Sequence, residues 1–142
     1  MDLVAGDDFW PGLSIAEFAS SMRIPDTVDT IRNRDALRGG MLAVRREMRS
    51  WKLSHTEAGI AKLSDIGAET IDGVHAGELL YTRAVFHTAA AELAETHADI
   101  SATAEGRERN EGRESVAQDL RRIATHAIRD LKGITRTAVE LI

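Results

Sequence analysis

Three segments of the chain place apolar residues three or four positions apart, the spacing of one face of an α-helix. They run from about residue 27 to 51, from 74 to 97 and from 114 to 133. The apolar positions are Val28, Ile31, Leu37, Met41, Val44, Met48 and Trp51 in the first, Leu79, Phe86 and Leu93 in the second, and Val116, Leu120, Ile123, Ala127 and Leu131 in the third. The pattern predicts three long helices, the first of them capped by Asp26.

The first 25 residues have a different pattern. Both prolines of the chain lie in this segment, and the spacing of Ile15, Phe18 and Met22 between them predicts one short helix. The rest is expected to form an extended N-terminal arm. Phe9 and Trp10 in this arm would be poorly placed in solvent, so we expect them either on the chain's own core or against a partner.

Two further segments lack a helical pattern. Residues 98–113 combine small residues with charges of alternating sign and have no apolar face, which predicts a mobile loop. Residues 134–142 are rich in β-branched residues and end in Leu141 and Ile142, and we expect no strand elsewhere in the chain to pair with them. This C-terminal tail either folds back onto the bundle or extends onto a neighbouring subunit or another protein.

The predicted fold is therefore all-α, a helical bundle of three long helices plus a short N-terminal helix, with an extended N-terminal arm and a C-terminal tail. We divide the chain into the arm (1–25), the bundle (26–133) and a C-terminal interaction tail (134–142). A length of 142 residues fits one domain with one modest core. No apolar run approaches the ~20 residues that cross a bilayer, and the first residues do not form a secretion signal, so we expect a soluble, intracellularly made protein with no membrane partner.

The charge is distributed unevenly along the chain. A formal net charge of −5 does not favour nucleic acid binding by the molecule as a whole. The face of the first predicted helix opposite its apolar positions, continued by Lys52, nevertheless carries seven basic residues against two acidic ones, and we single out Arg45, Arg46 and Arg49. This basic face is either solvated surface or a contact for an acidic protein surface or for nucleic acid.

Residues capable of catalysis or metal binding form no recognisable site in the sequence. The five histidines include no HExxH motif and no pair four residues apart, and the absence of cysteine removes thiolate ligands and a cysteine nucleophile. Asp65, Glu69 and Asp72 form an acidic connector for which turn and capping roles are expected. Tyr81 is expected on a helix surface and Arg83 in a salt bridge. We predict no catalytic residue, no metal site and no cofactor.

Short features along most of the chain resemble one known family. The central ones are Leu63-Ser64-Asp65-Ile66, Ile71-Asp72-Gly73 and Tyr81-Thr82-Arg83-Ala84-Val85, followed by an alanine-rich stretch. Phe9-Trp10-Pro11 precedes them, and the helix of residues 114–133 and the apolar Ile142 follow, so that the likeness covers about nine-tenths of the chain. In this order the features resemble the head-completion proteins of temperate contractile-tailed phages, with a shorter N-terminal leader.

The resemblance implies a structural adaptor of the head-to-tail connector in the virion neck and no enzymatic activity. Such a protein would dock beneath the portal protein after DNA packaging as a twelvefold homo-oligomeric ring. It would help to retain the genome and would receive the next neck or tail connector protein, with DNA in the channel as a further contact. The residues expected at these interfaces are Arg45, Arg46, Arg49, Thr135, Arg136, Val139, Leu141, Ile142, Phe9 and Trp10.

Two alternatives stand beside this interpretation. The first is a small helical DNA-binding protein of the packaging apparatus that uses Arg45, Arg46 and Arg49 on phosphates, although the acidic net charge and the lack of a compact helix-turn-helix disfavour it. The second is a hydrolase that uses Asp65 and Asp72 of the acidic connector.

Overall fold

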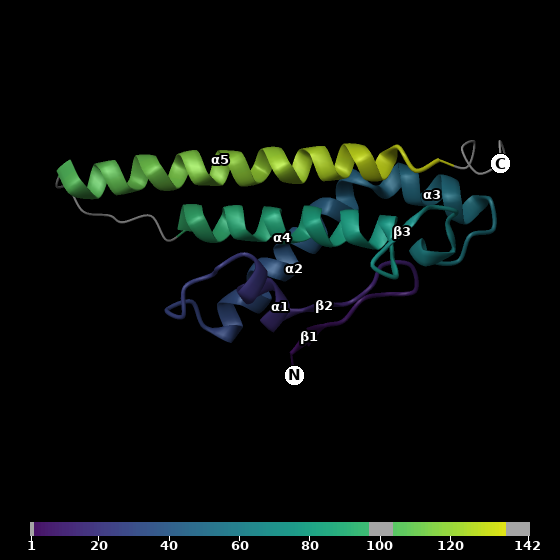
Figure 1. The fold of residues 1–142 in the computed structure, drawn as a ribbon, viewed down its shortest axis with the longest axis horizontal. Helices are drawn as coiled ribbons and strands as arrows, with labels where there is room; N and C mark the ends of the chain where they lie inside the picture. The colour runs from purple at the N-terminus through teal and green to yellow at the C-terminus, as the bar shows by residue number, and fades with distance from the viewer. Residues whose placement is uncertain (1, 97–103, 136–142) are drawn as a thin grey trace.

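The computed structural model describes residues 2–96 and 104–135, and this part is built mainly of helices (Figure 1). It contains five α-helices: α1 (Ile15–Ser21), α2 (Thr30–Glu47), α3 (Arg49–Glu57), α4 (Ala76–Thr96) and α5 (Ala104–Lys132). A 3₁₀ helix, η1 (Leu63–Asp65), and two antiparallel hairpins complete it, β1 (Leu3–Val4) with β2 (Leu13–Ser14) and β3 (Thr70–Ile71) with β4 (Val74–His75). The mainly helical prediction is confirmed, and the two small hairpins depart from an all-α fold.

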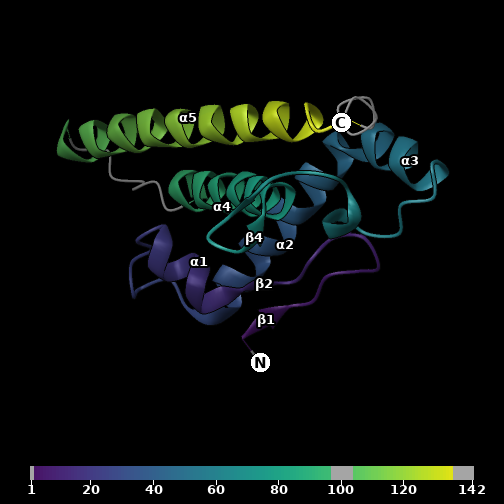
Figure 2. The same cartoon turned by 45° about the vertical axis from the view of Figure 1, so that its right-hand side comes forward.

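Helix α4 lies at the centre of the bundle, with α5 alongside it and α2 crossing on its other side (Figure 1, Figure 2). Small residues on several sides of α4 are buried, which lets both neighbours approach closely. A Cβ atom at Gly40 of α2 would lie only 2.8 Å from the carbonyl oxygen of Val85 in α4. The absence of a side chain at Gly40 therefore permits the close contact between α2 and α4.

The single helix predicted over residues 27–51 is wrong at both ends. Helix α2 begins after Asp29, whose carboxylate accepts the Arg32 N–H at 2.9 Å, so Asp29 and not Asp26 is its cap. Met48 then separates α2 from α3, with φ −94° and ψ 3°. Because Met48 is fully buried, the apolar spacing continues through the bend, and periodicity alone cannot tell a bent helix from a straight one.

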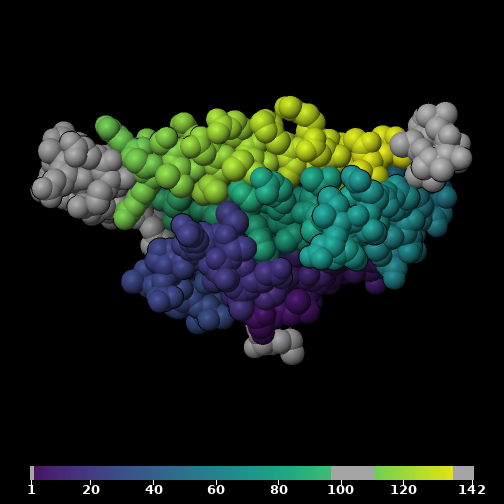
Figure 3. Space-filling model, in the orientation of Figure 1, coloured from purple at the N-terminus to yellow at the C-terminus, as the bar shows by residue number. Residues whose placement is uncertain are grey.

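The first 25 residues pack against the bundle and do not form an extended arm (Figure 3). The carboxylate of Asp2 accepts hydrogen bonds from the Ser14 hydroxyl at 2.5 Å and from the Ala16 N–H at 2.7 Å, which fixes the start of the chain beside α1. Phe9 and Trp10 are only 4% and 2% exposed. These two rings therefore pack on the chain's own core, and not against a partner, as the alternative had it.

Helix α5 begins well before the position that the sequence pattern indicates. Its first residue is Ala104, so the loop predicted over residues 98–113 is wrong from residue 104 onward, while residues 97–103 lie outside the described part. Arginine and glutamate are good helix formers, and opposite charges three or four residues apart support an exposed helix. With 29 residues, α5 is about 43 Å long.

The buried face of α5 agrees with the predicted one at Ala127 and Leu131, and toward the N-terminal end of the helix it is one residue out of step. Ala117 and Ala124 are buried there, whereas Val116 is 53% exposed. The small alanines face α4 and allow the two helices to approach closely. A pattern search that weights large apolar side chains misses such a face.

Candidate functional site

The aromatic residues of the N-terminal segment form a buried cluster with α3 and α4. The ring of Trp10 stacks on Tyr81, with centroids 4.6 Å apart and an interplanar angle of 18°, and on Trp51 at 6.2 Å. Phe9 meets the edge of Trp10 at 4.8 Å. The prediction that Tyr81 lies on the helix surface is therefore wrong, because its side chain is fully buried. Phe9 and Trp10 are likewise not available at the surface of this fold.

Arg45, the first candidate of the basic face, is turned toward this cluster. Its Nε–H donates to the Tyr81 hydroxyl oxygen at 3.1 Å, and its Nη1 lies 3.4 Å from the Asp7 carboxylate. Asp7 also accepts the N–H groups of Phe9 at 2.9 Å and Trp10 at 2.6 Å. Arg45 thus ties the N-terminal segment to α4 and is already engaged within the chain.

The electrostatics of this contact follow from burial and hydrogen bonding. Burial alone would raise the pKa of Asp7, but the two backbone N–H groups and the positive charge of Arg45 outweigh it and hold this pKa below its ordinary value. Burial raises the pKa of Tyr81, and the bond from Arg45 offsets part of that rise. At neutral pH the contact therefore joins a carboxylate, a guanidinium and a neutral phenol.

Arg46 and Arg49, the other two candidates of the basic face, are exposed. Arg38, Leu42 and Arg46 are four residues apart on α2 and share one face, which Arg49 continues past the bend. Leu42 in the middle of this face is 67% exposed. We call Arg38, Leu42, Arg46 and Arg49 the α2 stripe.

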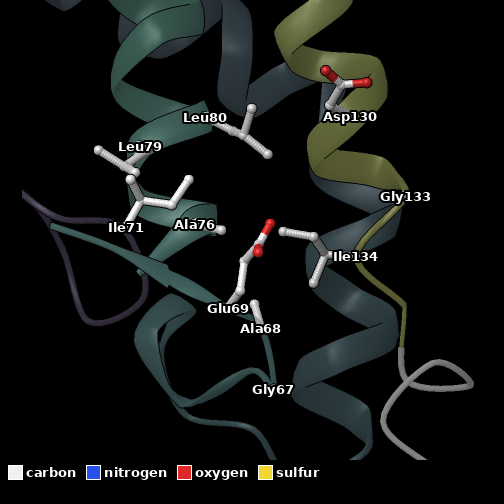
Figure 4. Close-up of a pocket in the computed structure, with 10 residues that line it drawn as sticks. All are labelled: Gly67, Ala68, Glu69, Ile71, Ala76, Leu79, Leu80, Asp130, Gly133 and Ile134. Carbon is white, nitrogen blue, oxygen red and sulfur yellow. The ribbon is translucent and has the colours of Figure 1, made fainter. Parts of the chain in front are cut away.

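An apolar groove opens between the β3–β4 hairpin, the start of α4 and the end of α5, with a volume of about 660 Å³ (Figure 4). Ile71 and Leu79 form one wall and are 57% and 36% exposed, although Leu79 was placed by its spacing in the core. Figure 4 shows the Ile134 side chain pointing in from the opposite wall. The two charged residues of the lining, Glu69 and Asp130, are both acidic. We call this the hairpin groove.

The hairpin that borders the groove is held by its turn and by a histidine. Asp72 and Gly73 have φ values of 55° and 74°, the left-handed values of a two-residue hairpin turn, so the turn role expected of Asp72 is confirmed. His75 accepts the Gly77 N–H at Nδ1, 2.9 Å away, and its Nε2 lies 2.6 Å from the Ile66 carbonyl oxygen. These bonds fix the hairpin against the segment that precedes it.

The C-terminal tail begins on the opposite wall of the groove. The Ile134 carbonyl oxygen accepts the indole N–H of Trp51 at 3.0 Å and lies 3.3 Å from Nε2 of His55. Ile134 packs against the core, and Thr135 is exposed. The start of the tail therefore folds onto the bundle. The candidate contact residues Arg136, Val139, Leu141 and Ile142 lie outside the described residues.

The acidic connector does not form a recognisable catalytic or metal site. Asp65, Glu69 and Asp72 are all exposed. Over residues 2–96 and 104–135, no group of three or more histidine, aspartate or glutamate residues is arranged to hold a metal ion. Within the same ranges, no helix has both the length and the apolar character needed to cross a membrane.

Sequence reasoning missed the hairpin groove, although one signal for it was present. Asp72-Gly73 between the β-branched Ile71 and Val74 is a strong hairpin signature. A hairpin there turns its apolar residues toward the start of α4, where Leu79 lies. The basic face was identified, but the sequence did not indicate that Arg45 points inward.

Comparison with known proteins gives consistent matches over the whole chain. A family model described as phage head completion protein (GPL) matches residues 4–142. The chain is 29% identical over 134 residues to the head completion/stabilization protein of Escherichia phage P2, which covers 94% of this chain and 79% of that protein. It is also 29% identical over 142 residues to the probable head completion/stabilization protein of Haemophilus phage HP1 (strain HP1c1), a match that covers 99% of this chain and 92% of that protein. No solved structure matches it significantly.

Proposed function

The chain belongs to the phage head completion protein family, and we propose that it completes the phage head as a structural subunit that docks beneath the portal protein. In this role it forms a twelvefold ring once DNA has been packaged, helps to retain the genome and receives the next connector protein. The observation that carries the proposal is the family match over residues 4–142, which includes every element of the described fold except the first residue of β1.

The α2 stripe is the surface that we assign to the portal. It alternates exposed arginines with Leu42, which is 67% exposed. An exposed leucine flanked by positive charges suits a protein surface that offers both apolar and acidic groups, because such a contact buries the leucine and pairs the arginines. The same leucine contributes nothing to binding a phosphate backbone.

This arrangement favours a protein partner over DNA. Of the three arginines considered for phosphate contact, Arg45 is already bonded to Tyr81 and Asp7. Arg46 and Arg49 lie on a chain whose formal net charge is −5. DNA binding depends mainly on accumulated positive charge, so the three exposed arginines of the α2 stripe, with a leucine among them, give a weak site for it.

The test is binding of the purified chain to the portal protein of its own phage, measured by native mass spectrometry and sedimentation. We expect one subunit per portal subunit, and we expect Arg46→Glu with Arg49→Glu to reduce binding strongly. The matched control is Arg122→Glu with Arg129→Glu, which makes the same charge change on the exposed side of α5.

Three outcomes would contradict the proposal or its surface. Failure of the unaltered chain to bind the portal removes the docking proposal itself. Equal losses in the two double variants show that net charge and not the α2 stripe determines binding. Tight, salt-sensitive binding to duplex DNA that only Arg46→Glu with Arg49→Glu abolishes assigns the stripe to DNA.

A further inference from the structure

We propose that the hairpin groove of one copy receives the C-terminal segment, residues 136–142, of the neighbouring copy. The inference rests on the proposed ring and deepens it by naming a contact between its subunits. It combines two features of the described fold: an apolar groove without an occupant from the described residues, and Ile134, in the wall of that groove, one residue before the described part ends.

The groove has the chemistry of a site for an apolar peptide. Ile71 and Leu79 are large apolar side chains left 57% and 36% exposed on one wall, and Val74 beside them is 38% exposed. The volume of about 660 Å³ leaves room for several side chains. An exposed apolar depression of this kind on a soluble domain commonly marks a binding surface.

The hairpin also offers a strand edge. Strand β3 pairs with β4 on one side, and it has no second strand partner among the residues that the structure describes. Residues 67–69, which lead into β3, line the groove. A segment in extended conformation could therefore add backbone hydrogen bonds along this edge while its side chains enter the groove.

The sequence of the tail fits both features. In an extended chain, Val139 and Leu141 point to the same side, and Glu140 points to the other. Val139 and Leu141 can thus enter the groove together while Glu140 faces solvent. Arg136, nearer the start of the segment, has the charge to pair with Glu69 or Asp130 at the groove, both of which are acidic.

The direction in which the chain leaves the bundle favours a neighbour's groove over its own. Trp51 and His55 of α3 hold the Ile134 carbonyl oxygen, and neither of them lines the groove. The last described residues therefore lead toward α3 and not into the chain's own groove. Residues 136–142 in extended conformation reach about 23 Å, enough to contact an adjacent subunit.

The contact has the symmetry that a ring requires. A tail on one subunit and a groove on the next are different surfaces, so each copy gives one and receives one. Head-to-tail contacts of this type close into a ring when the rotation per subunit permits. The tail and the α2 stripe are separate surfaces, so the subunit contact and the portal contact can form together.

The test uses cysteines introduced one at a time, because the chain has none of its own. Leu79→Cys is placed in one preparation of the full chain and Leu141→Cys in another that carries a size tag. The two are mixed and oxidised, both on the portal protein and as free chains at high concentration. We expect a disulfide-linked pair of one tagged and one untagged chain. Ile31→Cys replaces Leu79→Cys in the control, since Ile31 is 79% exposed on a different part of the surface.

A second pair of variants tests the groove without cross-linking. Ile71→Asp places a charge in the groove and is expected to raise the concentration needed for self-assembly about tenfold or more, because a carboxylate is costly to bury without a partner. Ile31→Asp is the matched control and should leave assembly unchanged. Circular dichroism spectra of both variants check that the helices remain folded.

The outcomes separate this inference from the proposed function. A chain that binds the portal but gives no Leu79–Leu141 cross-link overturns the tail contact and leaves portal docking intact. A cross-link among free chains without portal binding supports the tail contact and removes the docking proposal. A chain that carries both Leu79→Cys and Leu141→Cys is the third preparation. If it links only within one chain, the groove belongs to the chain's own tail and the inference is overturned, as it is by the absence of any cross-link in both conditions.

Discussion

Replacing Trp10 with alanine tests whether the N-terminal segment is part of the folded core. The ring is 2% exposed, stacks on Tyr81 at 4.6 Å and meets Phe9 edge-on at 4.8 Å. Removal of a buried tryptophan or phenylalanine side chain lowers the free energy of unfolding by about 3–5 kcal/mol, because apolar contacts are lost and a cavity remains. With stacking contacts on more than one side, we expect about 4 kcal/mol for Trp10→Ala.

A loss of this size is a large part of the stability of a small domain, which is about 5–15 kcal/mol in total. Thermal unfolding followed by far-UV circular dichroism should show a midpoint lower by about 10 °C or more. Urea unfolding should show a lower midpoint with an unchanged slope. Leu42→Ala is the control: that side chain is 67% exposed, so its removal should change stability by no more than about 0.5 kcal/mol.

The result that would refute the reasoning is a loss below about 1 kcal/mol for Trp10→Ala, similar to an ordinary surface change. The ring would then not be part of the core in solution, and Phe9 and Trp10 would return to consideration as partner contacts. Trp10→Phe provides a gradation, since a smaller ring keeps part of the stacking and should lose less than alanine does.

Further predictions concern a helix contact and a charge. Gly40→Ala should destabilise the fold by about 1–3 kcal/mol, because the new Cβ would lie 2.8 Å from the Val85 carbonyl oxygen. Gly39→Ala should be neutral or stabilising by up to about 1 kcal/mol, because the nearest atom to its new Cβ is an oxygen of the flexible Glu92 carboxylate at 3.1 Å. Urea unfolding of the two variants compares their stabilities, and equal effects would contradict the geometry. Asp7→Asn keeps a hydrogen-bond acceptor but removes the negative charge. Because the pKa of Asp7 is lowered in the folded state, its charged form stabilises the fold, and the variant should be less stable at pH 7. The difference in stability between the unaltered chain and the variant should shrink as the pH falls through the pKa of Asp7 in the folded state, which is below the ordinary value of 3.8. Urea midpoints from pH 7 to pH 3 measure this difference. A difference independent of pH would contradict the role of the charge.

The spacing of apolar residues predicted the location of the helices well. It predicted less well where a helix bends and which of its sides is buried. The buried positions Leu37, Met41 and Val44 of α2 agree with the apolar pattern. Ile31, at 79% exposure, does not, because it lies in the first turn of α2. The break at Met48 was hidden because the residue at the bend is itself buried.

Helix α4 shows why a single apolar face was the wrong expectation for a central helix. It is covered by α2 on one side, by α5 on another and by the N-terminal rings near Tyr81. Its alanines and Tyr81 are therefore buried, while Leu79, near its start, borders the groove. The apolar spacing places Phe86 and Leu93 in the core, where they lie, but it also places Leu79 there, which is 36% exposed.

The candidate surfaces were predictable only in part. The concentration of arginine on residues 32–49 is visible in the sequence, but the inward turn of Arg45 depends on Tyr81 and Asp7, which lie 36 and 38 residues away from it. The hairpin groove joins the hairpin and the start of α4, which are adjacent in sequence, to the distant end of α5, and only its turn, at Asp72-Gly73, has a local signal. Long-range contacts of this kind do not leave a periodic trace.

Helix α3 connects the two ends of the chain mechanically. The ring of Trp51 stacks near Trp10, while its indole N–H holds the carbonyl of Ile134. Under the proposed contact with a neighbour, a load on the tail would pass along the backbone into α5 and, through the Ile134 carbonyl, to Trp51 and His55 of α3. We expect the N-terminal segment and the end of α5 to yield together, as one cooperative unit, and not as two independently fraying ends.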